Sequence, residues 1–244
     1  MSNAFFRVRQ RLVKESRYGQ LIGVALAEMV LIIAGILLAL QIDNWNQNRQ
    51  ERKITNDYLE IIKHNIAHDI KDLEDISDFR KQSLIYTDTI LGYYRNEHIS
   101  DPKLFELGFR SLFLEERFYP NRSAYESLKS SGFLRNVGNT RIEEGLNGYN
   151  LHIDRILNDQ DVFNSLILTI EEKLSENGFY IEYAEIFQWE HNDTINFTYE
   201  NLVKYPDVQS TFIRSKMWLE QFILEYTQCS NIGKDLLEEL NNGD

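Results

Sequence analysis

One apolar stretch stands out in the chain: it runs from Leu21 to Ile42 and reads LIGVALAEMVLIIAGILLALQI. Only Glu28 carries a charge within it. About 20 apolar residues, each rising about 1.5 Å, cross a hydrocarbon core of about 30 Å. The pattern therefore predicts one transmembrane helix over residues 20–43, with a lead-in at 1–19 and a separate domain at 44–244.

The lead-in sets the predicted orientation. Residues 1–20 hold five basic side chains and one acid, so their net charge is five minus one, or +4. Basic residues beside a span stay on the cytoplasmic side. We therefore expect a cytoplasmic N-terminus and a periplasmic domain at 44–244. Trp45, three residues beyond the apolar run, suits the membrane interface.

A cleaved signal peptide is the competing interpretation. Met29 to Leu40 has the length of a signal-peptide apolar region. The residues that follow, among them Gln41, Asp43 and Asn44, lack the pair of small side chains that a cleavage site requires. The sequence therefore favours an uncleaved signal anchor.

Beyond the span, apolar residues recur every three or four positions, which predicts an amphipathic helix. The series is Ile54, Tyr58, Ile61, Ile62, Ile66, Ile70, Leu73, Ile76 and Phe79, and it continues toward residue 94. A second helix is predicted at 104–118, opened by Asp101-Pro102. The fold class predicted is mainly α: a single N-terminal transmembrane helix followed by a periplasmic bundle of four or five helices.

Local signals predict where the later helices begin and end. Ser123 and Glu126 have the spacing of a capping box. Gly132 and Gly138 bracket a break, and Asn139 or Thr140 starts a helix that ends at Asn177-Gly178. Pro206-Asp207 opens the last helix. The segment between the last two helices is weakly periodic, and FYIEY and INFTY within it fit short strands or extended loop.

Charge and cysteine content narrow the partners. The net charge is −12, and removing +4 for residues 1–20 and −1 for Glu28 leaves −15 for residues 43–244. So acidic a domain repels nucleic acid and anionic headgroups, and no nucleic-acid partner is expected.

The single cysteine, Cys229, excludes an intrachain disulfide. It is interpreted as a half-buried thiol, with a link between subunits as the alternative.

Glu28 is the sharpest candidate for a functional residue. An ionised carboxylate in hydrocarbon costs several kcal/mol, so Glu28 must be protonated, paired or close to the membrane surface. At 100° per residue, Glu28, Gly35 and Ala39 lie within about 20° of each other. Small residues let helices approach closely, so this face predicts a helix contact. Structural hydrogen bonding, a shallow position and ion or proton movement all stay open.

Other candidates are weaker. His64 and His68 have the i, i+4 spacing of metal ligands. Asp69 and Asp72 lie nearby, but they are better explained as charged residues that face solvent than as further ligands. Because no phosphate-binding, dinucleotide or nucleophile motif occurs, no cofactor and no enzymatic activity are expected. An aromatic cluster is a candidate recognition surface, or alternatively closes one end of the bundle. Its members are Phe179, Tyr180, Tyr183, Phe187 and Trp189.

Residues 27–53, AEMVLIIAGILLALQIDNWNQNRQERK, together with SAYESLKSSGFLRNV at 123–137, carry a family resemblance. They resemble a family of uncharacterised single-span membrane proteins common in Bacteroidetes-type bacteria, whose spans exit through an Ala-Leu-Gln-Ile-Asn-Asn-Trp-Asn-like sequence. Asp43 replaces the usual Asn here. The resemblance implies an inner-membrane anchor with a periplasmic domain, and it implies no activity.

Two functions compete on this basis. The first is a membrane-anchored periplasmic interaction or scaffold protein that self-associates or binds other membrane proteins. The second is a single-span subunit of an ion-driven membrane machine that uses Glu28, which is an analogy of architecture only.

Overall fold

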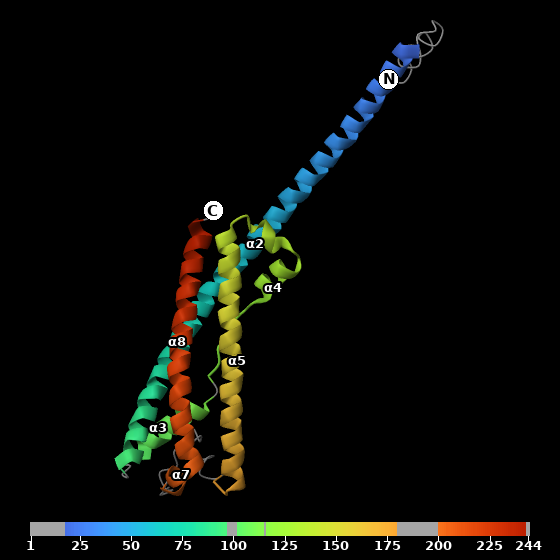
Figure 1. Ribbon diagram of the computed structural model, residues 1–244. Coiled ribbons are helices and arrows are strands. Elements are labelled where there is room, and N and C mark those ends of the chain that lie inside the picture. Colours follow the sequence, from blue (N-terminus) through green and yellow to red (C-terminus); the bar gives the residue numbers. More distant parts are fainter. Residues whose placement is uncertain (1–17, 97–101, 115, 180–199, 243–244) are drawn as a thin grey trace. The chain divides into compact units, whose positions relative to one another are not determined.

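The computed structural model describes residues 18–96, 102–114, 116–179 and 200–242, and all regular structure in these ranges is helical (Figure 1). The elements are α2 (Tyr18–Asn96), α3 (Pro102–Phe113), α4 (Ser123–Ser130), the 3-10 helix η1 (Phe133–Val137), α5 (Thr140–Glu176), α7 (Glu200–Lys204) and α8 (Pro206–Asn242). The predicted mainly α class is confirmed.

The chain divides into two units, Met1–Thr55 and Asn56–Asp244, called here the N-terminal and C-terminal units. The predicted boundaries at residues 19 and 43 stay predictions. In the N-terminal unit, the described part of α2 contains one strongly apolar stretch of 18 residues, none of which is buried. This helix has the length and composition of a membrane span, as predicted, and a signal sequence shares those properties.

Three long helical segments build the C-terminal unit: residues 56–96 of α2, α5 and α8 (Figure 1). Ion pairs join α8 to α2, with Lys234 Nζ 2.6 Å from Glu74 Oε1 and Lys216 Nζ 2.7 Å from Asp88 Oδ1. Between them lies a continuous apolar core, to which Phe222 contributes with no exposed surface. The shorter α3 and α7 lie toward one end of this unit and α4 toward the other (Figure 1).

The buried side of α2 in the C-terminal unit follows steps of four and three residues. The series is Ile62, Ile66, Asp69, Leu73, Ile76, Arg80, Ser83, Thr87 and Ile90, all buried. This alternation is the pattern of a coiled-coil seam, in which each residue inserts between side chains of the facing helix. Four polar residues therefore occupy core positions. By contrast, the predicted core residues Ile54 and Ile61 are exposed.

Most helix ends lie where local chemistry predicts them. Pro102 and Pro206 open α3 and α8. The side chain of Asn139 accepts a hydrogen bond from the amide of Arg141 and caps α5. Gly178, at φ 82°, follows the last turn of α5 in a conformation that glycine adopts without steric cost.

Two predicted boundaries are wrong. Ser123 begins α4 but does not cap it, because its amide and hydroxyl both donate to the side-chain oxygen of Asn121. The second helix ends at Phe113 rather than Phe118, and the chain beyond it is non-helical where Glu116 uses its carbonyl to accept a hydrogen bond from Arg80. FYIEY extends beyond the described residues after Phe179, and INFTY lies wholly outside them.

Candidate functional site

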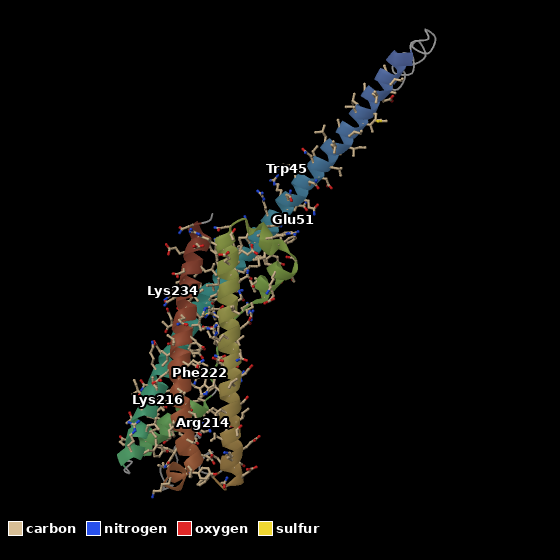
Figure 2. The ribbon with its side chains drawn as sticks, in the orientation of Figure 1. Trp45, Glu51, Arg214, Lys216, Phe222 and Lys234 are labelled. Carbon is tan, nitrogen blue, oxygen red and sulfur yellow. The ribbon has the colours of Figure 1, made fainter. Side chains whose placement is uncertain are left out.

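The predicted helix-contact face lies on the uncovered part of α2. Glu28, Gly35 and Ala39 are all exposed, and no neighbouring atom lies within 4 Å of where a Cβ on Gly35 would sit. In Figure 2, side chains project from both sides of this part of the helix. The face is therefore open for contact within the N-terminal unit, and the role of Glu28 stays a prediction.

Trp45 marks the end of the apolar run and is 64% exposed. The guanidinium carbon of Arg49, one turn further along α2, lies 5.9 Å from the centroid of its ring. A guanidinium over an indole face at this distance is a favourable cation–π contact.

The two predicted metal-ligand candidates do not gather a site around them. His64 and His68 are exposed on α2, and His68 Nδ1 lies 3.1 Å from Asp72 Oδ2. Within the described ranges, no three His, Cys, Asp or Glu side chains come together in a way that could hold a metal ion.

Asp69 is not the solvent-facing charge that the sequence suggested. It is 3% exposed, and the Tyr149 hydroxyl of α5 donates to its Oδ2 at 3.1 Å. Burial raises the pKa of Asp69 to about 6 from its ordinary 3.8, and the hydrogen bonds from Tyr149 and the backbone of Asn121 oppose that rise. The carboxyl group thus joins α2, α5 and the segment before α4 at one buried point.

Cys229 lies in α8 close to this carboxyl group. Its thiol is fully buried, and desolvation, with a smaller contribution from Asp69, raises its pKa to about 12. A buried, protonated thiol is a poor nucleophile and cannot meet a second subunit. The predicted thiol on a helix is more deeply buried than expected, and the alternative of an intersubunit disulfide is wrong for this fold.

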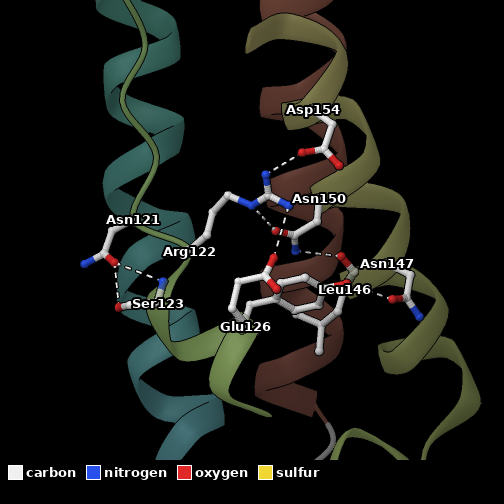
Figure 3. Close-up of polar contacts among 9 residues, drawn as sticks. Asn121, Arg122, Ser123, Glu126, Leu146, Asn147, Asn150 and Asp154 are labelled. Atoms are coloured by element: carbon white, nitrogen blue, oxygen red, sulfur yellow. Dashed lines mark hydrogen bonds and ion pairs between the residues drawn. The ribbon is translucent and has the colours of Figure 1, made fainter. Parts of the chain in front are cut away.

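Figure 3 shows how the segment before α4 is fixed to α5. Arg122 donates to Asn150 Oδ1 at 3.0 Å, to Asp154, and to Glu126 Oε1 at 3.3 Å. Asn65 of α2 donates to the carbonyl of Asn121 at 3.0 Å on the other side. Arg122 therefore fixes the segment before α4 to α5, and its side chain and the Asp69 carboxyl group both line a cavity of about 10 Å³.

Arg80 lies in the core of the same unit, 2% exposed. Its Nη2 donates to the carbonyl of Glu116 at 2.6 Å, while Nε and Nη1 have no hydrogen-bond partner. Its guanidinium carbon lies 5.6 Å from the ring centroids of both Phe163 and Phe222. Desolvation lowers the pKa of Arg80, and the nearby Tyr226 hydroxyl opposes that effect.

A polar groove of about 320 Å³ lies between α2 and α8. Glu74 and Lys234 pair across it, and Lys81 pairs with Asp78 at 2.8 Å. The buried hydroxyl of Ser77 lines the groove without a hydrogen-bond partner. The groove can hydrogen-bond a small polar molecule, but its charged groups already neutralise one another.

The predicted aromatic surface is described at one residue only. Phe179 is half-buried against the core, and its ring centroid lies 5.0 Å from that of Tyr205. Such packing agrees with the interpretation that this residue closes one end of the bundle. Tyr180, Tyr183, Phe187 and Trp189 lie outside the described residues.

Sequence reasoning missed Asp69, Tyr149 and Arg80 as a set of buried polar groups. The available signal was the four-and-three spacing, which places Asp69 and Arg80 in line with Leu73 and Ile76.

No protein-family model, no curated protein and no solved structure matches this chain significantly.

Proposed function

We propose that this chain is a membrane-anchored periplasmic interaction or scaffold protein that works as an oligomer or as a subunit of a membrane complex. One observation carries the proposal: residues 22–42 of α2 expose large apolar side chains around the whole helix. Examples are Leu31 at 71%, Val30 at 64% and Leu38 at 62% exposed. Removing each such side chain from water stabilises the protein by about 1.5–3 kcal/mol. Lipid or other apolar helices provide the surroundings that remove it from water.

The basic lead-in supports the orientation, with the N-terminus in the cytoplasm. The resemblance at residues 27–53 supports an inner-membrane location. The C-terminal unit has its own apolar core, so the exposed apolar run is not needed to fold it. A tethered domain with a polar groove and a charged surface is suited to binding other molecules.

Topology and processing test the proposal together. A reporter enzyme that is active only in the periplasm, fused after Asp244, should be active in intact cells. The mass of the mature protein should include residues 1–42, and the protein should resist extraction from membranes at alkaline pH. A mature chain that starts after residue 42 would show a signal peptide and overturn the anchor. Activity of a cytoplasm-only reporter at the same position would overturn the orientation.

The second candidate is a subunit of an ion-driven membrane machine. The observation that favours it is an exposed carboxyl group, Glu28, within the apolar run. Intramembrane ionisable residues are expensive and commonly mark ion or proton pathways. Glu28→Gln separates the two functions, because an ion-driven machine should lose its function while the complex still assembles, whereas a scaffold should assemble and work normally.

A further inference from the structure

The helix face that continues from the apolar run carries one indole and two guanidinium groups. Trp45, Arg49 and Arg52 lie within about 60° of each other at 100° per residue, and all three are exposed. The Arg49 guanidinium carbon lies 5.9 Å from the Trp45 ring centroid, so it points back toward the apolar run. Trp45 is labelled on this part of α2 in Figure 2.

The depth of these groups follows from helix geometry. Arg49 lies seven residues beyond Ile42, a rise of about 10 Å. Side chains on a helix tilt toward its N-terminus, which is here the direction of the span. The polar layer on each side of a bilayer is about 5–8 Å thick. An arginine side chain leaning back from this position reaches the level of the lipid phosphates.

The acids of this segment lie on other sides of the helix. Asp43 and Glu51 are turned about 120° or more from Trp45, and Gln47 Nε2 donates to Glu51 Oε1 at 3.1 Å. Three basic residues minus two acids leave +1 for residues 43–55, and subtracting this from −15 leaves −16 for 56–244. The basic face is therefore a local exception in an acidic chain.

We call the surface formed by Trp45, Arg49 and Arg52 the Trp45 face. We propose that this face binds the phosphodiester headgroups of anionic phospholipids where the span leaves the bilayer. The inference rests on the proposed membrane anchor. Guanidinium groups pair with phosphate oxygens through two parallel hydrogen bonds, and an indole is favoured at the same depth. The contact offsets the repulsion between the acidic C-terminal unit and an anionic membrane surface.

The test uses the full chain in mild detergent, titrated with phosphatidylglycerol or phosphatidylcholine, with bound lipid measured by native mass spectrometry. Arg49→Gln combined with Arg52→Gln should weaken phosphatidylglycerol binding about thirtyfold, since each basic group near an anionic surface contributes about fivefold. Arg49→Lys combined with Arg52→Lys should lose less phosphatidylglycerol affinity than the double glutamine variant. Lys71→Gln with Arg95→Gln removes the same charge from exposed positions further along α2 and should leave binding unchanged.

Equal phosphatidylglycerol affinity for the wild type and the glutamine variant overturns the headgroup proposal. So does equal loss in the Lys71 and Arg95 control, because the effect would then come from net charge alone. Reconstitution into lipid discs distinguishes this failure from failure of the anchor. A chain that enters discs but shows no dependence on Arg49 and Arg52 refutes only the headgroup contact, whereas a chain that stays outside them refutes the anchor.

Discussion

Replacing Asp69 by asparagine removes a carboxylate that the C-terminal unit buries. In the folded state burial holds the pKa of this carboxyl group at about 6, against an ordinary value of 3.8. The folded state therefore binds the proton more tightly than the unfolded state does. The stability from the neutral form is fully present below pH 3.8 and is lost as the pH rises toward 6. The pKa difference corresponds to at most about 3 kcal/mol.

Asparagine has the same shape as the neutral acid and never ionises. Asp69→Asn should therefore unfold with a free energy about 1–3 kcal/mol above that of the wild type at pH 8, and close to it at pH 4. Urea denaturation of the full chain in detergent, followed by circular dichroism from pH 4 to 8, measures the difference. Asp75→Asn, at an exposed position on the same helix, is the matched control and should show no such pH dependence.

Tyr149→Phe tests the same site from the other side. It removes the hydroxyl that donates to Asp69 at 3.1 Å, and this hydrogen bond helps the ionised form more than the neutral one. The loss of stability should therefore be larger at pH 8 than at pH 4.

Parallel pH curves for Asp69→Asn and the wild type, or an asparagine variant that is less stable at pH 8, would refute the reasoning.

Three further predictions follow from single residues. If Glu28 is structural, Glu28→Gln should assemble normally and Glu28→Leu should lose about 1–2 kcal/mol of association in membranes; if it carries protons, both should assemble but lose function. Cys229 should resist alkylation at pH 8 until urea unfolds the protein, because its thiol is buried and protonated. Arg80→Ala should lower the free energy of unfolding by about 3 kcal/mol or more through the cavity it leaves, whereas Arg80→Met should cost less than about 1 kcal/mol or stabilise.

The elements that the sequence predicted correctly are those fixed by neighbouring residues. Asn139 caps α5 because its own side chain accepts the amide two residues on. Gly178 ends it because glycine allows a positive φ. The capping box at Ser123 failed for an equally local reason: Asn121 already accepts both the hydroxyl and the amide of that serine.

What the sequence could not show depends on distant partners. Asp69 and Tyr149 are 80 residues apart, and an aspartate between His68 and Ile70 has the same local appearance whether it faces water or another helix. The end of α3 depends likewise on Arg80, which hydrogen-bonds a carbonyl 36 residues away. Charged residues are expected at the surface because unpaired charges are rarely buried, but Asp69 and Arg80 are buried and each has a specific partner in another segment.

We expect Asp69 and Arg80 to hold α2 in one register against α5 and the segment after α3, because each has one specific partner there. Apolar residues at four-and-three spacing alone permit a shift by seven residues, which would leave Asp69 without Tyr149 and Arg80 without the Glu116 carbonyl. Asp69→Asn combined with Arg80→Met should therefore raise the urea midpoint at pH 8 while making the packing less unique. The expected result is a more stable variant with broader amide NMR signals and stronger binding of a hydrophobic dye. A more stable variant with spectra as sharp as the wild type would show that apolar packing alone sets the register.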